Sequence, residues 1–150
     1  MVSASTFDEN ISSGSVVAIL STTDPDADDT FTYSLVEGDG DTDNSSFTID
    51  GDELKIKESP DFETKSSYSI RVETKDSGGL TFEKSFTLSV NDLNEDPTDL
   101  SVSASSFDEN ISSSSVVAEL SSTDEDSGDT HTYSLVSGSG DTDNSSFTID

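Results

Sequence analysis

The chain has 150 residues, of which 33 are acidic and 6 are basic, and its formal net charge is -27. Such a charge makes nucleic acid and anionic membranes unsuitable partners, because both attract Lys and Arg. Cysteine is absent, which excludes disulfides and Cys-based metal sites. With neither a signal peptide nor an apolar run that could cross a bilayer, we expect no direct membrane insertion and a piece of a longer secreted protein.

Apolar and polar residues alternate along much of the chain, which is typical of strands covered on one face. In chain order, turn signals delimit seven strands near 2–7, 15–21, 31–36, 46–50, 53–57, 67–75 and 80–91. The last two are joined by a hairpin at "DSGGL". Seven short strands in about 100 residues predict an all-β, Greek-key, immunoglobulin-like β-sandwich.

The first part of the sequence is repeated. Residues 2–50 return at 102–150, and only ten of these 49 positions differ. A period of about 100 residues in an all-β chain indicates tandem domains. We expect repeat 1 over 1–98, with a linker at 91–98, and the first half of repeat 2, about four strands, over 99–150. This truncated half should fold poorly alone, because it lacks strands to pair with and every basic residue of the chain.

Differences between the two copies separate core from surface. Ile19 becomes Glu119 and Phe31 becomes His131, so both positions should face solvent or a sheet edge. Unchanged apolar positions form the predicted core: Phe7, Ile11, Val16, Val17, Leu20, Tyr33, Leu35, Val36, Phe47 and Ile49.

Carboxylates gather at the expected strand ends and turns. The stretches are "FDEN" (7–10), "TDPD" (23–26), "PDFE" (60–63), "KDSGG" (75–79) and "NDLNEDP" (91–97), with copies at 107–110 and 123–126. Calcium takes six to eight hard oxygen ligands, as such stretches supply. Zinc would require His or Cys, and His131 is the only histidine. The pattern therefore favours Ca²⁺ over a merely solvated acidic surface.

Four of these stretches carry a family resemblance. They are Asp8-Glu9-Asn10, Pro60-Asp61-Phe62-Glu63, Asp92-Leu93-Asn94-Glu95-Asp96-Pro97 and Asp124-Glu125-Asp126. In this order and spacing the chain resembles cadherin repeats, most of all the cadherin-like repeats of large bacterial surface and secreted adhesins. The resemblance covers essentially the whole chain.

The resemblance implies calcium ions at the junction between consecutive repeats. For the inner ions it implies Glu9, Asp61, Glu63, Glu95 and the Leu93 carbonyl, with Asp92 in the same linker motif. For the outermost ion it implies Asn94, the Asp96 carbonyl, Asp124 and Asp126, with a carbonyl near Gly128 or Asp129. Asp24, Asp26 and Asp76 occupy the matching positions of repeat 1.

The chain departs from the family pattern in three places. Glu95 stands where the family commonly has Asp, and Asp96 where it has Asn. Pro60 replaces the usual Leu. The repeat 2 counterpart of Asp76, which would complete the outermost site, falls beyond residue 150.

Other readings are open to the same residues. The stretch 38–44, "GDGDTDN", begins like an EF-hand loop but lacks the later Gly and Glu, so an ordinary turn is favoured. Tyr33, Tyr68 and Tyr133 either line a sugar-binding surface or belong to the sheets. His131 has no counterpart in repeat 1 and no nucleophile elbow is present, so we expect no enzyme.

The expected function is a calcium-dependent extracellular adhesion or spacer module, in which Ca²⁺ stiffens a tandem array. Its partners would be neighbouring repeats of the same chain. The alternative is a calcium-dependent module that binds carbohydrate or a like domain on another cell, with polysaccharide or another cell-surface adhesin as partner. Either function places the protein outside the cell or on its surface.

Overall fold

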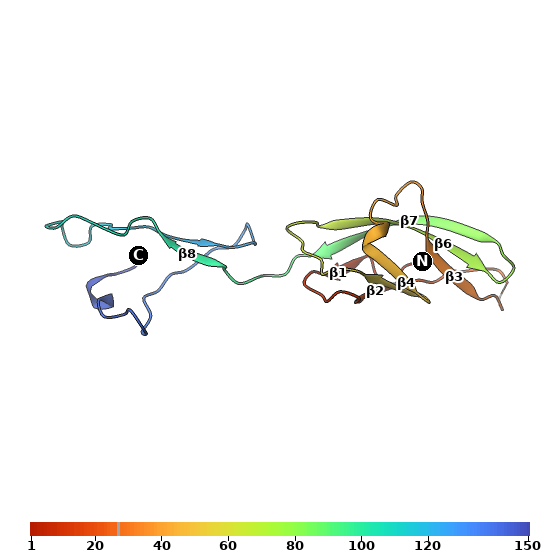
Figure 1. Cartoon of the computed structure of the whole chain (residues 1–150), viewed down its shortest axis with the longest axis horizontal. Coiled ribbons are helices and arrows are strands. Elements are labelled where there is room, and N and C mark those ends of the chain that lie inside the picture. The colour runs from red at the N-terminus through yellow and green to blue at the C-terminus, as the bar shows by residue number, and fades with distance from the viewer. Residues whose placement is uncertain (27) are drawn as a thin grey trace. The chain divides into compact units, whose positions relative to one another are not determined.

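The computed structural model describes residues 1–26 and 28–150, so position 27, one of the ten that differ between the copies, lies outside it. The chain divides into two compact units, unit 1 (Met1–Leu93) and unit 2 (Asn94–Asp150). Within the described residues the regular elements are strands and two short 3-10 helices (Figure 1). No helix in that part of the chain is long and apolar enough to span a membrane.

Unit 1 is a sandwich of two sheets (Figure 1). The larger sheet has the order β1 (Thr6–Asp8), β7 (Thr81–Asn91), β6 (Ser67–Asp76), β3 (Phe31–Leu35). The smaller sheet has the order β2 (Val16–Ile19), β5 (Glu53–Ile56), β4 (Phe47–Asp50). These seven strands lie where the alternation predicted them, and the expected all-β sandwich is confirmed.

Strand direction decides which loops meet. β1 runs parallel to β7, with Phe7 opposite Val90 and Asp8 opposite Asn91, whereas the other pairs of unit 1 are antiparallel. Two parallel neighbours finish at the same edge of a sheet. The residues that follow β1 and β7 therefore lie together at one pole of the sandwich.

The core lies between the two sheets. Phe47, Leu54, Ile56, Ile70 and Leu88 are almost completely buried. Phe47 meets Phe7 edge to face, with ring centroids 6.5 Å apart, an arrangement that contributes beyond the buried area. This packing holds both sheets, and with them the loops at each pole, in fixed positions.

The first predicted strand is divided between the sheets. Val2 forms a bridge with Leu20, and the N–H of Ser3 donates to the carbonyl of Ile19 at 2.8 Å, both beside β2. The chain then crosses, and the N–H of Ser89 donates to the carbonyl of Ser5, beside β7. β1 consequently begins at Thr6 rather than at residue 2.

The predicted core needs two corrections. Val36 is only half-buried and does not belong to the core cluster. Val16 is 44% exposed, whereas Val17 and Ala18 are both buried. The register of β2 against β5 shifts between Val16 and Ala18, and such an irregularity breaks the alternation of side chains. Ala18 is therefore a core residue that alternation did not indicate.

Unit 2 contains two strands, where four were expected. β8 (Asp99–Val102) pairs antiparallel with β9 (Leu120–Thr123). The copies of β3 and β4 form no strands, because their partners in unit 1 are β6 and β5, which have no counterpart in the sequence of repeat 2. Phe107 and Phe147 keep the edge-to-face contact of Phe7 and Phe47, yet no residue of 94–150, all of them described, is buried.

Candidate metal centres

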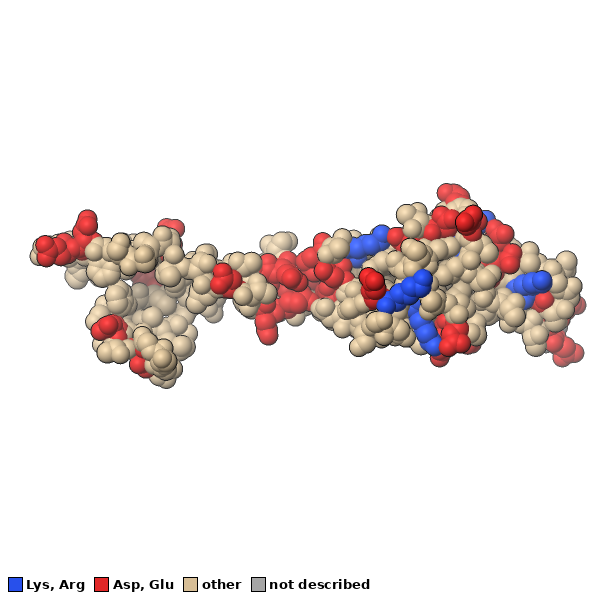
Figure 2. Space-filling view, in the orientation of Figure 1, with Lys and Arg blue, Asp and Glu red and all other residues tan. Residues whose placement is uncertain are grey.

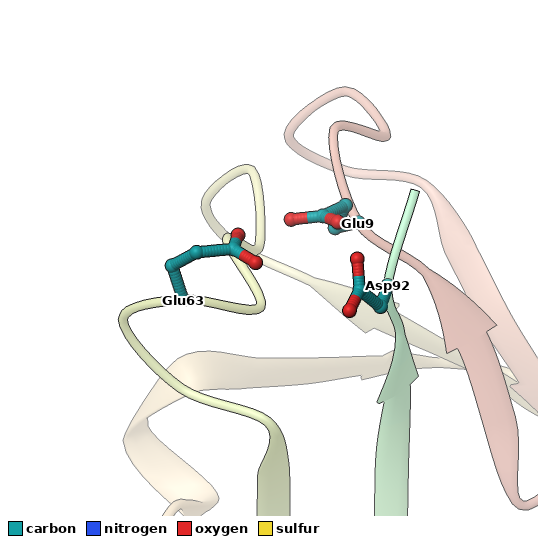
Figure 3. A group of neighbouring side chains, drawn as sticks. All are labelled: Glu9, Glu63 and Asp92. Carbon is teal, nitrogen blue, oxygen red and sulfur yellow. The ribbon is translucent and has the colours of Figure 1, made fainter. Parts of the chain in front are cut away.

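Three carboxylates meet at the pole of unit 1 where β1 and β7 end. Glu9 follows β1, Asp92 follows β7, and Glu63 lies in the loop between β5 and β6. One carboxylate oxygen of each lies within 4.8 Å of those of the other two. Figure 3 shows the three carboxylates pointing toward one another from three separate segments. The fold therefore assembles a centre from residues that are up to 83 positions apart.

Glu9 is the fixed member of this centre. Its side chain is the buried charged group of unit 1, with 2% of the residue exposed. Oε2 accepts a hydrogen bond from the N–H of Phe62 and Oε1 accepts one from the N–H of Leu93, each at 2.7 Å. Two charge-assisted bonds hold the carboxylate in one orientation. Glu63 and Asp92 are exposed and complete the group.

Asp61 builds the turn that presents Glu63. Its Oδ1 accepts the N–H of Thr64 and its Oδ2 accepts the Thr64 hydroxyl, both at 2.8 Å. These bonds from Thr64 lower the pKa of Asp61 below its usual 3.8. The N–H of Lys65 donates to the Asp61 carbonyl at 2.9 Å, which closes one helical turn around Glu63. The structure thus shows Asp61 as the residue that shapes this loop.

A second group lies in unit 2. One carboxylate oxygen from each of Asp124, Asp126 and Asp129 lies within 4.8 Å of the others. Oδ1 of Asp124 accepts the N–H of Asp126 at 3.1 Å, and the N–H of Asp129 donates to the Asp126 carbonyl at 3.1 Å. The segment 124–129 therefore folds back so that its carboxylates converge.

Asp124 is the most enclosed member of this second group. Its side chain is only 5% exposed, and its Oδ2 has no hydrogen-bond partner among the described residues. Nε2 of His131 lies 3.9 Å from this oxygen. A buried carboxylate oxygen without a bond is costly, and a bound cation would relieve that cost.

Linker residues border the same hollow of unit 2. Asn94, Glu95 and Asp96 line a depression of about 310 Å³ together with Asp124 and Asp129. The Glu95 N–H donates to Oδ2 of Asp126 at 2.8 Å, and the Asn94 amide donates to the Glu95 carbonyl at 2.9 Å. Side-chain and carbonyl oxygen atoms of these linker residues thus lie around one hollow.

A third group lies at the other end of the repeat 1 strands. It joins Asp24, Asp29 and Asp76, again within 4.8 Å. Asp29 was not among the predicted ligands, although its repeat 2 counterpart Asp129 was, so the offset of 100 residues could have indicated it. Asp26 is not in the group. Its N–H donates to Oδ1 of Asp24 at 3.0 Å, and its carboxylate is exposed.

The EF-hand-like stretch has a structural explanation. Asp43 lies 2.6 Å from the Lys65 ammonium and accepts the N–H of Ser69 at 2.7 Å. Asp41 accepts the N–H of Gly38 at 2.9 Å. Asp43 thus fastens the loop to β6, and Asp41 closes the loop on itself, so the stretch is an ordinary turn. Tyr33 and Tyr68 pack against the core, and burial raises the pKa of Tyr68.

The donor chemistry of the three groups fits a hard cation. Every contributing atom is a carboxylate oxygen, which suits Ca²⁺ and not a metal that prefers nitrogen or sulfur. Figure 2 shows acidic side chains in dense patches, and the basic residues all belong to segment 55–84. Two carboxylates 4.8 Å apart repel by about 1 kcal/mol in water, and more where one is buried. A cation turns that repulsion into attraction.

Comparisons with known proteins agree with this fold. The sequence profile of the cadherin domain family matches residues 3–91. Protocadherin gamma-A11 of Homo sapiens is 31% identical over 129 residues, covering 81% of this chain and 14% of that protein. The solved extracellular cadherin domains 3-6 of protocadherin gamma B2 are 26% identical in sequence to this chain, with a TM-score of 0.60. The match covers 85% of this chain and 31% of the solved chain. The ectodomain of human desmocollin-1 shares the fold, at 24% identity and a TM-score of 0.55, over 83% of this chain and 25% of that one.

Unit 1 is an all-β sandwich with carboxylate groups at both poles. The chain belongs to the cadherin domain family. Cadherin domains are extracellular, typically calcium-dependent adhesion modules, and the homologues are adhesion proteins, which points away from catalysis. The chain spans about 14% of the length of the curated relatives that it matches.

Proposed function

We propose that this chain is a calcium-dependent spacer of an extracellular adhesin, in which Ca²⁺ stiffens consecutive repeats. The observation that carries the proposal is the group Glu9, Glu63 and Asp92, in which a buried carboxylate, fixed by two backbone N–H groups, faces two exposed ones. Asp61, Leu93, Asn94, Glu95 and Asp96 are proposed to assist through carboxylate, amide or carbonyl oxygens.

The mechanism acts through the linker. The first group includes Asp92, which lies inside linker 91–98, and the group Asp124, Asp126 and Asp129 follows the linker in the sequence. Without a cation, the carboxylates repel and the linker bends freely. With Ca²⁺ bound, Asp92 becomes one ligand of a fixed centre and the segment that follows it loses freedom.

Affinity sets where such a switch operates. Extracellular calcium modules have dissociation constants of about 10⁻⁴ to 10⁻³ M. Calcium outside a cell would fill the sites, and cytosolic calcium would not. At a concentration about a hundredfold above Kd, one site adds roughly 2.7 kcal/mol to the free energy of unfolding.

Small-angle scattering tests the spacer role. The radius of gyration and its spread should both change when calcium is removed with EDTA, because the linker gains freedom. Addition of magnesium at the same concentration is the control for ionic strength. A radius of gyration that stays constant between calcium and EDTA contradicts the proposal.

A second candidate is homophilic binding. It is favoured by one observation, that a solved relative, 26% identical with a TM-score of 0.57, is described as a cis-dimer of protocadherin gammaB7. Sedimentation of this chain with and without calcium distinguishes a dimerising module from a pure spacer. From the resemblance of the motifs, we further propose that the partner is polysaccharide or another adhesin. The same resemblance leads us to propose a bacterial source.

A further inference from the structure

The only histidine of the chain lies beside the second carboxylate group. His131 stands where repeat 1 has Phe31, at one of the ten positions that differ between the copies. Its Nε2 lies 3.9 Å from Oδ2 of Asp124, and its side chain is 22% exposed. His131 also borders the hollow that Asp124 and Asp129 line. The group Asp124, Asp126 and Asp129 therefore has a nitrogen donor at its edge.

Repeat 1 shows that this placement follows from the fold. Phe31 begins β3 and lies directly opposite Asp76, the last residue of β6. Residues directly opposite each other in an antiparallel pair point to the same face of the sheet, and Asp76 belongs to the group with Asp24 and Asp29. The side chain at position 31 of a repeat consequently lies on the side of that repeat's carboxylate group. In repeat 1 that side chain is a phenyl ring, which offers no donor atom.

The donor set decides which cation the second group suits. Ca²⁺ prefers oxygen ligands alone, whereas imidazole suits Zn²⁺ and other late first-row divalent metals. Three Asp carboxylates and one His would supply the four ligands of a tetrahedral zinc site. Cysteine is absent from the sequence, so no thiolate of this chain competes for such a metal. The added imidazole therefore shifts the preference of this group away from that of an all-oxygen site.

The separation of two of these donors is close to that in such a site. With bonds of about 2.1 Å, two ligand atoms on one tetrahedral zinc lie roughly 3.4 Å apart. Nε2 of His131 and Oδ2 of Asp124 are 3.9 Å apart, which is too long for a hydrogen bond. The same Oδ2 is buried and has no hydrogen-bond partner in the described part of the chain. A cation between the two atoms would satisfy both.

We propose that Asp124, Asp126, Asp129 and His131 form a site for a divalent transition metal such as Zn²⁺, and that His131 sets this preference. The corresponding group of repeat 1, which has Phe31 in place of the imidazole, stays a site for a hard cation. Two copies of nearly one sequence thus differ in metal preference through one side chain. The assignment goes beyond the proposed function, which is carried by the centre of Glu9.

The sole histidine reports on its own site. His131 gives the only imidazole ring signals in the proton NMR spectrum of the full chain, provided that no histidine tag is present. The chain is first freed of metal with EDTA, which is then removed, and Zn²⁺ is added at neutral pH. The ring signals should shift and reach a plateau, because the imidazole becomes a ligand.

The repeat supplies two reciprocal variants. His131→Phe installs the residue of repeat 1 and should weaken Zn²⁺ binding about tenfold or more, while Ca²⁺ binding at the centre of Glu9 stays the same. Phe31→His installs the residue of repeat 2 beside Asp24, Asp29 and Asp76. It should add a second Zn²⁺ site, with a second set of imidazole signals that shift. Phe31 is only partly buried, so unit 1 should tolerate the change.

Three results would overturn the proposal. Equal Zn²⁺ affinity of the native chain and His131→Phe would show that the imidazole is no ligand. Ring signals of His131 that stay in place while Zn²⁺ binds would show the same. If Phe31→His gained no Zn²⁺ site, position 31 would not face the carboxylate group. Loss of Ca²⁺ binding in Glu9→Gln concerns the proposed function alone, so the two proposals can fail separately.

Discussion

Oε1 of Glu9 accepts a hydrogen bond from the backbone N–H of Leu93 at 2.7 Å, which joins two residues 84 positions apart. Glu9 follows the first strand of the sandwich and Leu93 is the last residue of unit 1. The bond therefore ties the start of the linker to the centre formed by Glu9, Glu63 and Asp92. Calcium binding and the conformation of the linker would therefore both depend on the side chain of Glu9.

Replacement of that side chain should affect both properties. Glu9→Gln removes the charge and puts an amide where two backbone N–H groups need acceptors, so it should lower the free energy of unfolding by about 1–3 kcal/mol in EDTA. It should also weaken calcium binding by tenfold or more. Urea unfolding in EDTA and calcium titration measure the two effects separately.

The repeat supplies the control for this change. Glu109 is the counterpart of Glu9 in the second copy and is exposed. Glu109→Gln removes the same charge from the same local sequence. It should leave the unfolding of unit 1 and its calcium affinity within error, and an equal loss in both variants would show that general charge, rather than this centre, is responsible.

Glu63→Gln should separate affinity from stability. Glu63 is an exposed member of the centre, so its neutralisation removes a ligand charge while the core stays intact. Calcium affinity should fall, and the melting temperature in EDTA should stay the same or rise slightly, because repulsion with Glu9 and Asp92 is relieved. Glu58→Gln, an exposed change in the same loop, is the matched control. Unchanged affinity in Glu63→Gln contradicts the centre as drawn.

Asn44 gives a prediction for the fold alone. Its Oδ1 accepts the N–H of Arg71 at 2.9 Å and its amide donates to the Val36 carbonyl at 2.9 Å. Asn44→Ala should lower the free energy of unfolding by about 1–3 kcal/mol, because partly buried backbone groups lose their partners. Asn144 makes the Val136 bond, so chemical unfolding should detect a smaller effect of Asn144→Ala. Equal effects would contradict the loop's anchoring role.

The sequence predicted the strands well and their faces less well. Alternation located all seven strands of unit 1, because a half-buried strand imposes that pattern. It could not show that segment 2–7 changes sheets, or that the irregularity between Val16 and Ala18 exposes Val16, since both depend on pairing with distant strands.

The candidate ligands were predicted through motif order and stay a prediction, but the structure shows which of the carboxylates lie together. Parallel pairing of β1 with β7 explains why Glu9 and Asp92 meet. Side-chain direction was not predictable: the Asp61 carboxylate is bonded to Thr64, and Asp29 rather than Asp26 joins Asp24 and Asp76. Local turns decide these directions, and spacing alone does not report them.

Acid should weaken one surface pair. Asp50 lies 2.8 Å from the Lys55 ammonium, and the hydrogen bond between them lowers the pKa of Asp50 below 3.8. Asp50, together with Glu53 at 2.9 Å, raises the pKa of Lys55 to about 12. A carboxylate whose pKa is lowered by folding stabilises the folded state at pH values above 3.8, its pKa in the unfolded chain. That contribution disappears as the pH falls through the lower pKa of the folded state. The contribution of Lys55 to stability is present below about pH 10.5 and is lost as the pH rises through the folded-state pKa of about 12.

Asp50→Asn should therefore be slightly less stable than the native chain at pH 6 in EDTA, and the difference should vanish near pH 2. Asp150→Asn provides the control, because repeat 2 has no counterpart of Lys55 in the sequence. Melting curves across the acid range measure both variants. A deficit of Asp50→Asn that persists at low pH would show that the pair is not its cause.

The most direct test of the central claim is a calorimetric titration of calcium into the metal-free chain, repeated with Glu9→Gln and Glu109→Gln. We predict saturable binding with a dissociation constant of about 10⁻⁴ to 10⁻³ M, weakened at least tenfold by Glu9→Gln and unchanged by Glu109→Gln. Absence of saturable heat, or equal binding by all three chains, would contradict the assignment of calcium to the centre of Glu9, Glu63 and Asp92.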